Sequence, residues 1–378
     1  MFIIGIWSLG FGISHGAALD ISRVGMGARS LALGRAQVAG LDLASVFVNP
    51  ANAAGLDRFA MTSMYVNLNE DVGYGMVGLG FPVLEGNLGS VGVSFINAST
   101  GNIYTTDRDA NGRTIVISNF EYSSKLGQIS YGKEISRNIS MGCALKLYSR
   151  SFDTIGGGQA NGVDLDVGML FFPRENLILG LTAQNLLPVE MANLNWATGA
   201  KEDIPINLRG GINLSPRKDI RILADYDSLG NMHTGVEWEV KQFLDLRAGA
   251  EIVPIGKASQ VTNLSAGLGL KYRGFFFDYA YYYDTLVSDA SSHFFSLSFL
   301  LPYREIEVPP IIMAKPEVIK TATPEVTATP TVEVQKKAMA TKPVKKPAVK
   351  KAAKKPPAKK RSVAVKKKKL IWNWLKRR

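Results

Sequence analysis

Acidic side chains recur two residues apart in this sequence, as Asp164 and Asp166, Asp225 and Asp227, and Glu237 and Glu239. Residues two apart share one face of a β-strand, so each pair would point to one side. A catalytic pair would need an acid and a base in different environments, whereas carboxylates lining a polar lumen need only counter-charges. We therefore predict no enzyme site, and a set of lumen-facing charges made up of Asp164, Asp166, Arg209, Arg221, Glu237, Glu239, Lys241 and Arg247.

Other motifs that could do chemistry are poorly supported. Gly73, Gly75 and Gly78 have the spacing of a dinucleotide fingerprint, but the strand-like Phe81-Pro82 follows where such a site needs a helix. We interpret these glycines as positions that bend a barrel strand or make room for a plug. No Cys/His or His-Glu cluster occurs, and the single Cys143 alternates with apolar neighbours and is expected to face lipid. The sequence thus predicts neither a metal nor a cofactor.

The elements that carry these residues follow a period of two. From Arg58 to Tyr303, segments of about ten alternating residues are separated by turn-forming Gly, Asn, Asp, Pro or Ser. One side of each segment is almost continuously apolar, and the other is small or charged. Candidate strands lie near residues 58–69, 72–84, 87–97, 114–134, 138–151, 160–173, 176–187, 204–214, 219–227, 231–241, 243–253, 260–272, 273–284 and 292–303.

Alternation alone fits a soluble sandwich or a propeller as well as a membrane barrel. The membrane barrel is favoured because no linker composition divides the strand-rich region, and because tyrosines gather toward the ends of the predicted strands. These tyrosines are Tyr65, Tyr104, Tyr122, Tyr272, Tyr283 and Tyr303. We predict an all-β fold, a transmembrane antiparallel barrel of about 14 strands.

The segment from Val24 to Leu56 resembles the opening of the PorV/PorQ group of FadL-type outer-membrane barrels. The matching residues are Gly27-Ala28-Arg29, Gly34, Asp42, Ala44-Ser45 and Asn49-Pro50-Ala51, and the resemblance extends over residues 20 to 304. Two departures are Arg35, where a glycine is usual, and about 75 residues after Tyr303, where such barrels normally end.

This resemblance implies that residues 19–57 fold into the barrel as a hatch, with a motif formed by Gly27, Ala28, Arg29, Gly34, Asn49, Pro50 and Ala51. Asn49 and Pro50 also have a local reason to be there, because proline pushes the preceding residue to extended geometry and asparagine bonds nearby backbone. We expect a turn inside the lumen at this position rather than a catalytic group.

The two ends of the chain differ from the barrel, which we place at residues 58–304. Residues 1–18 contain an apolar run followed by small residues and are interpreted as a signal peptide, with a buried N-terminal strand or helix as the alternative. Up to Glu305 the chain holds 23 Lys and Arg against 28 Asp and Glu, and the remainder holds 21 against 4. The basic charge therefore belongs to the end of the chain, which we divide into a Thr/Pro linker (305–335) and a disordered Lys/Pro/Ala-rich tail (336–378).

An even number of strands with short periplasmic turns would place both termini in the periplasm, with the barrel in outer-membrane lipid. The tail would then meet anionic cell-wall or lipid surfaces, using an apolar anchor made up of Leu370, Ile371, Trp372, Trp374 and Leu375. An inert spacer and a nucleic-acid-binding tail are the alternatives; nucleic acid is not the expected partner in that compartment.

Three functions remain open for such a barrel. The resemblance to PorV implies a secretion-associated shuttle or scaffold of the type IX kind, with exported proteins or secretion components as partners. FadL-type barrels imply instead a channel for hydrophobic small molecules. A structural anchor from outer membrane to cell wall through the tail is the third hypothesis.

Overall fold

The computed structural model describes residues 21–68, 72–153, 158–187, 194–197, 199, 201–202, 204–255, 259–285 and 291–302. The predicted signal peptide, linker and basic tail, including the anchor residues Leu370, Ile371, Trp372, Trp374 and Leu375, lie outside these residues. No helix among the described residues is long and apolar enough to cross a membrane.

Fourteen antiparallel strands form a closed ring. They are β1 (Ala60–Leu68), β2 (Val72–Pro82), β3 (Ser90–Arg108), β4 (Thr114–Ser136), β5 (Ile139–Asp153), β6 (Gln159–Arg174), β7 (Leu177–Gln184), β10 (Asn207–Arg217), β11 (Ile220–Asp227), β12 (Met232–Lys241), β13 (Leu244–Pro254), β14 (Gln260–Tyr272), β15 (Phe275–Tyr283) and β16 (Ser291–Leu300). Each pairs with its neighbours in the chain, β7 pairs with β10, and β1 pairs with β16 to close the ring. The predicted barrel is confirmed, including its number of strands.

Two short strands, β8 (Leu194–Trp196) and β9 (Lys201–Glu202), lie between β7 and β10 and extend the sheet beside β6. The sequence did not predict them, because the period of two needs more than three residues to be recognised.

Along the strands, buried residues alternate with exposed residues that are mostly apolar. On β6, Asp164 and Asp166 are buried, and Val163, Leu165 and Val167 between and beside them are exposed. The apolar residues therefore make the outer face of the ring. Cys143 lies on this outer face, as its alternation predicted.

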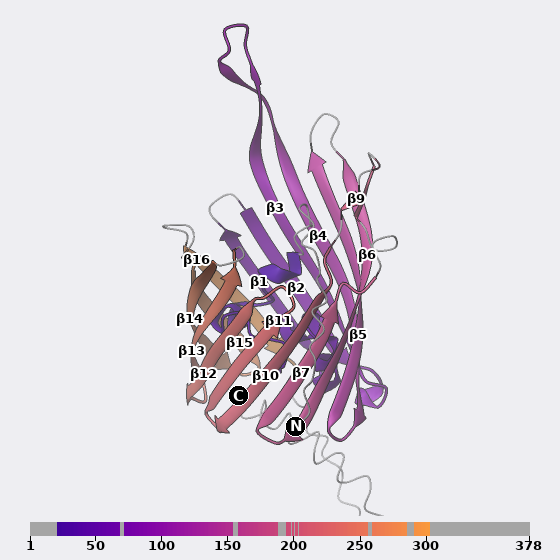
Figure 1. Ribbon diagram of the computed structural model, residues 1–378. Helices are drawn as coiled ribbons and strands as arrows, with labels where there is room; N and C mark the ends of the chain where they lie inside the picture. Colours follow the sequence, from indigo (N-terminus) through magenta and orange to yellow (C-terminus); the bar gives the residue numbers. More distant parts are fainter. Residues whose placement is uncertain are drawn as a thin grey trace, which may run out of the picture. The chain divides into compact units, whose positions relative to one another are not determined.

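The strands β3 and β4 extend beyond the rest of the ring as a hairpin (Figure 1). Pairing of β3 with β2 ends at Thr100, and pairing of β4 with β5 begins at Glu121. The predicted strand 87–97 was therefore too short, because the Gly, Asn and Asp residues after Thr100 were interpreted as a loop. Tyr104, predicted at a strand end, lies within this hairpin.

Residues 21–57, which we call the inner segment, lie inside the ring of strands (Figure 1). The inner segment contains η1 (Ile21–Val24), the short helix α1 (Ala28–Ala32), η2 (Ala44–Phe47) and η3 (Pro50–Gly55). A further 3₁₀ turn, η4 (Leu84–Gly86), connects β2 to β3. Helix α1 contacts β13 to β16, and η3 contacts β3 to β6, so the inner segment crosses the lumen from one side of the wall to the other.

Candidate functional site

Glycines on the inner wall decide how closely the inner segment approaches it. A Cβ atom added at Gly142 would lie 2.4 Å from the backbone carbon of Pro50, and one at Gly249 would lie 2.1 Å from the backbone nitrogen of Gly34. Backbone atoms of the inner segment approach Gly132, Gly180 and Gly235 in the same way, and the Asn49 side chain approaches Gly168. The wall lacks side chains where the inner segment's backbone lies against it.

Of the three glycines with the dinucleotide spacing, only Gly78 makes room for the inner segment. Its added Cβ would lie 2.5 Å from the Phe47 ring, whereas the nearest atoms to Gly73 and Gly75 are 3.9 and 3.8 Å away. These glycines stand on β2 with no helix after them.

The Asn-Pro-Ala motif forms the start of η3. Asn49 has extended geometry, its side chain accepts a hydrogen bond from the Ala51 N–H at 3.1 Å, and Pro50 takes the first helical position. The Asn49 amide also donates to the Val38 carbonyl at 2.9 Å, and Asn49 is completely buried. The motif thus caps a helix and joins two parts of the inner segment.

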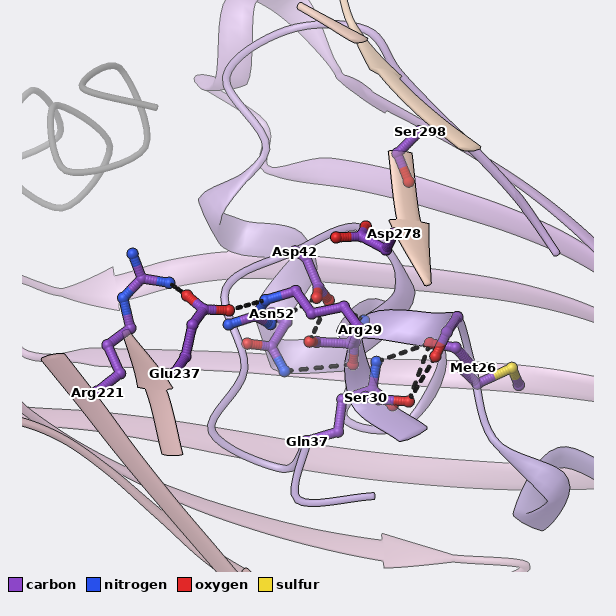
Figure 2. A network of polar contacts seen from close by, with 12 residues as sticks. Met26, Arg29, Ser30, Gln37, Asp42, Asn52, Arg221, Glu237, Asp278 and Ser298 are labelled. Atoms are coloured by element: carbon purple, nitrogen blue, oxygen red, sulfur yellow. Dashed lines mark hydrogen bonds and ion pairs between the residues drawn. The ribbon is translucent and has the colours of Figure 1, made fainter. Parts of the chain in front are cut away.

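The Gly-Ala-Arg motif starts α1 and places Arg29 in a buried ionic cluster. Gly27 has a φ of 93°, a conformation that favours glycine, and the next residue's amide bonds the Ser296 hydroxyl at 3.2 Å. Arg29 donates to Glu237 at 2.7 Å and to Asp42 at 2.7 Å. Figure 2 shows Glu237 between Arg29 and Arg221, with Asp42 on the other side of Arg29.

The surroundings of Arg29 and Asp42 favour the charged forms of both side chains. Burial opposes the charge of Arg29, but Glu237 and Asp42 raise its pKa above the ordinary value. Burial also opposes the charge of Asp42, yet the Arg29 guanidinium and hydrogen bonds from Ser45 hold the pKa of Asp42 below its ordinary value.

The cluster continues on the wall. Arg247 contacts Glu237 at 2.9 Å, Asp278 at 2.6 Å and Asp245 at 3.1 Å. Lys271 then bridges Asp245 at 2.5 Å and Glu239 at 3.3 Å. One connected network therefore joins the inner segment to β11 through β15.

A second group of contacts surrounds Gly34 and Arg35. Both residues have positive φ, 62° and 65°, so the glycine usual at Arg35 is replaced by a side chain in a strained conformation that costs about 1 kcal/mol or more. The Arg35 guanidinium is held 2.9 Å from Glu251 and 4.9 Å from the centre of the Tyr282 ring. These contacts offset the strain.

The predicted lumen charges fall into three groups. In the first group, Arg221, Glu237 and Arg247 lie buried in the network, with Glu239 half-buried at its edge. The second group is the pair of Arg209 with Asp225, at 3.3 Å. In the third, the buried Asp166 pairs with Lys146 at 2.8 Å, and Asp164 accepts a hydrogen bond from the Leu187 N–H at 3.0 Å. Lys241 differs from the expectation. A bulge between Glu239 and Lys241 ends the alternation, and Lys241 is exposed with its ammonium 5.7 Å from the Phe243 ring.

Several residues of the site were not predicted. Asp278 lies in the segment "FFFDYAYYY", where aromatic residues on both faces hide the alternation, and Lys146 could have been found from its alternation with Leu145 and Leu147. Within the part of the chain that the structure describes, no group of three or more Asp, Glu, His or Cys residues is arranged to hold a metal ion.

A cavity of about 60 Å³ lies between the inner segment and the wall. Its walls combine side chains of the inner segment with residues of β1, β15 and β16, including Met26, Leu43, Leu56, Thr62, Phe276 and Ser296. Charged residues of the ionic network, Arg29, Asp42, Asp245, Lys271 and Asp278, also border the cavity.

Aromatic side chains gather where β4, β5 and β8 leave the ring. Phe152 contacts Tyr122 at 4.9 Å, Trp196 at 5.2 Å and Phe120 at 6.1 Å between ring centres. Tyr122 and Phe152 share the strand face of the buried Ser124 and Arg150, so they lie at the lumen mouth. Tyr122 was among the tyrosines predicted toward strand ends. We call Phe120, Tyr122, Phe152 and Trp196 the mouth cluster.

Comparison with known proteins finds the same fold in solved structures. The "CymD monoaromatic hydrocarbon channel" has a TM-score of 0.58 and 11% identity, covering 75% of this chain and 100% of that one. The Pseudomonas putida toluene transporter TodX has a TM-score of 0.54 and 12% identity, over 75% and 97% of the two chains. The Ralstonia pickettii toluene transporter TbuX has a TM-score of 0.52 and 12% identity, over 73% and 98%.

No protein-family model matches the sequence, and no curated protein matches it. At these identities the structural likeness shows the fold alone. That fold is a closed 14-stranded antiparallel barrel, as the resemblance implied, and the comparisons do not show membership of the PorV/PorQ group.

Proposed function

We propose that this protein is a non-enzymatic outer-membrane barrel through which small, uncharged apolar molecules pass. The fold supports this function because solved structures that share it carry the titles of monoaromatic hydrocarbon channels and toluene transporters. An outer face of apolar side chains supports the location in a membrane.

The main support for an uncharged substrate is that the charges inside the barrel are paired with one another. Every buried or half-buried cation of the described lumen has a carboxylate partner: Arg29 with Asp42 and Glu237, Arg35 with Glu251, Lys146 with Asp166, Arg150 with Glu202, Arg209 with Asp225, Arg221 with Glu237, Arg247 with Asp278, and Lys271 with Asp245. Asp164 and Asp227 add further carboxylates, which accept hydrogen bonds from backbone N–H groups. The lumen therefore carries more carboxylates than cations.

A ligand with a carboxylate would have to displace an existing ion pair and enter a region of negative charge. Breaking such a buried pair costs several kcal/mol, about 3 to 5 where one partner is lost. An uncharged apolar molecule has no such cost, and the mouth cluster offers aromatic faces for its first contact. This argument favours hydrocarbons over fatty acids.

The orientation follows from the connections between strands. The turns at residues 137–138, 175–176, 218–219, 242–243 and 273–274 are short and lie at the end of the ring where β1 begins and β16 ends. Short turns of such barrels face the periplasm, so we place this end and the following basic tail there, and the mouth cluster outside the cell.

Uptake of matched solutes tests the proposal. Gram-negative cells that lack such a channel would express the full-length chain, and the initial uptake of labelled toluene and of benzoate would be measured. We expect several-fold faster uptake of toluene and no change for benzoate, which has the same ring with a carboxylate. Equal gains for both would indicate an unselective pore, and no gain with heat-modifiable protein in the outer membrane would contradict the function.

The secretion-associated role implied by the PorV resemblance has less support, because the similar structures are described as hydrocarbon channels. The anchoring role depends on residues 336–378, outside the described residues. Co-sedimentation of the protein with cell-wall material, with and without those residues, would test it separately.

A further inference from the structure

Buried charges are distributed unevenly around the inner wall of the barrel, and two arcs of the wall differ most. Four neighbouring strands, β16, β1, β2 and β3, form what we call the uncharged arc. All of their buried side chains among the described residues are uncharged: Ser292, Phe294, Ser296, Ala60, Thr62, Met64, Val66, Tyr74, Met76, Ser90, Ser94 and Ile96. Strands β10 to β14 form the charged arc, which carries Arg209, Arg221, Asp225, Asp227, Glu237, Asp245, Arg247, Glu251 and Lys271.

The inner segment is bound to the charged arc by ionic contacts. Besides the pairs of Arg29 with Glu237 and Arg35 with Glu251, the carboxylate of Asp225 accepts from the backbone N–H groups of Gln37 at 2.6 Å and Val38 at 2.9 Å. Separating the inner segment from this arc would leave buried charges without partners, which is strongly unfavourable.

Contacts with the uncharged arc are neutral hydrogen bonds. The Ala28 amide donates to Ser296, the Tyr74 hydroxyl donates to the Gly25 carbonyl at 3.1 Å, and the Ser90 hydroxyl donates to the Leu56 carbonyl at 2.8 Å. A neutral hydrogen bond contributes much less than a buried ion pair, so separating the inner segment from this arc costs less than separating it from the charged arc.

The packing of the inner segment also makes separation easier at the uncharged arc than at the charged arc. On the uncharged arc, the atoms nearest to Gly78, Gly80 and Gly92 belong to side chains of the inner segment. On the charged arc, the atoms nearest to Gly235 and Gly249 belong to its backbone. Side chains can rotate to open a path, whereas backbone contacts would require the whole inner segment to move.

The cavity of about 60 Å³ lies at the edge of the uncharged arc, where Thr62 and Ser296 line it. Its lining also includes Arg29, Asp42, Asp245, Lys271 and Asp278, each of which is held in an ion pair. A single hydrophobic cluster, which includes Met26, Met64 and Met76, links this region to Leu194 in the β7–β10 connection. Methionine side chains adapt readily to new neighbours, so this cluster can admit a small apolar molecule more easily than a rigid aliphatic core.

We infer that the ligand route follows the interface between the inner segment and the uncharged arc, and that the cavity at Met26, Leu43, Leu56, Thr62, Phe276 and Ser296 is a binding site on it for an uncharged apolar molecule. The inner segment stays attached to the charged arc while its side chains and the uncharged arc move apart. This inference rests on the proposed function.

Two disulfide locks test the route. A Cβ atom at Gly92 would lie 2.8 Å from Cγ1 of Val46, so a Val46→Cys, Gly92→Cys pair would tie the inner segment to the uncharged arc. A Cβ atom at Gly180 on β7 would lie 3.0 Å from Cγ1 of Val38, so Val38→Cys, Gly180→Cys is the matched lock away from that arc. Both would be made in full-length protein carrying Cys143→Ser.

Toluene uptake by cells would be measured before and after reduction, with heat-modifiable mobility as the check of folding and mass spectrometry as the check of cross-linking. We expect oxidation of the Gly92 lock to lower uptake about tenfold and reduction to restore it, while the Gly180 lock has no effect in either state. Uptake that survives the oxidised Gly92 lock, or that stops with the Gly180 lock, would overturn the route.

The comparison separates this inference from the function itself. If the unlocked protein speeds toluene uptake but the Gly92 lock does not slow it, only the route is wrong. If the unlocked, folded protein gives no uptake, the proposed function fails. Should the Gly92 variant fold poorly, Thr62→Phe and Ser298→Phe, which would fill the cavity, replace it; undiminished uptake with both would again contradict the route.

Discussion

Glu237 is the carboxylate on which the largest number of buried cations depends. It accepts hydrogen bonds from Arg29 of the inner segment and from Arg221 and Arg247 of the wall. Because all four residues are at most 8% exposed, water cannot replace a lost partner.

Replacing Glu237 with Gln should therefore destabilise the barrel by about 3 to 5 kcal/mol, since three guanidinium groups would share one neutral amide. The temperature at which the protein loses its compact gel mobility would measure the effect. Asp219→Asn is the control, because Asp219 pairs with an Arg217 side chain that is 69% exposed and should contribute less than about 1 kcal/mol. Equal shifts for the two variants would contradict the central position of Glu237.

At this scale the sequence predicts which residues point inward but not which of them meet. Alternation places Glu237 on the opposite face from Val236 and Trp238, and both of these are exposed. Its bond to Arg29, 208 residues away, depends on the path of the inner segment, which has no period to interpret. The bulge that turns Lys241 out of the lumen leaves no clear mark in the sequence either.

The inner segment packs closely against the strands at glycines, which have no side chain to keep it away. At Gly142 the backbone of Pro50 occupies the space that a side chain would need. Gly127 on β4 has no atom within 4 Å of an added Cβ. Gly142 therefore has no room for a larger side chain, whereas Gly127 on the neighbouring strand does.

We expect Gly142→Ala to displace η3 and to lower the thermal midpoint of the barrel, with a loss of about 1 to 3 kcal/mol from overpacking. Gly127→Ala should leave the midpoint unchanged or raise it slightly, because alanine restricts the unfolded chain. Limited proteolysis of the inner segment would report displacement directly. Protection of the inner segment in Gly142→Ala equal to that in Gly127→Ala would show that the contact is not tight.

Element boundaries were predictable where the period of two was long. The predicted 260–272 strand agrees with β14, and 72–84 agrees with β2 to within two residues. Prediction failed in residues 100–108, where Gly101 and Asn102 resemble a turn although the chain remains paired across two register shifts. Pairing with a partner strand overrides the local preference of such residues.

At the largest scale, the described residues form a closed ring, the inner segment within it and a hairpin that extends from the ring. Beyond Thr100 and Glu121, β3 and β4 pair only with each other among the described strands. The closed ring could be foreseen from the number and length of the alternating segments, and the inner segment only from the resemblance to FadL-type barrels.

Deleting residues 103–118 and closing the chain with a two-residue turn should leave the ring intact, because no pairing between other strands is lost. We expect the thermal midpoint to stay within a few degrees of that of the full chain and toluene uptake to continue. A collapse of the heat-modifiable form would mean that the hairpin is needed to complete the ring.

The pairing of Ala60 with Leu300 has a consequence for the order of assembly. The ring cannot close until its last strand has been synthesised and has returned to the first, a contact of high sequence separation that forms slowly. The inner segment precedes every described strand in the chain and packs against glycines on opposite walls, where an added Cβ atom would clash with it. We therefore expect the inner segment to take its place before the seam between β1 and β16 closes, so that the wall forms around it.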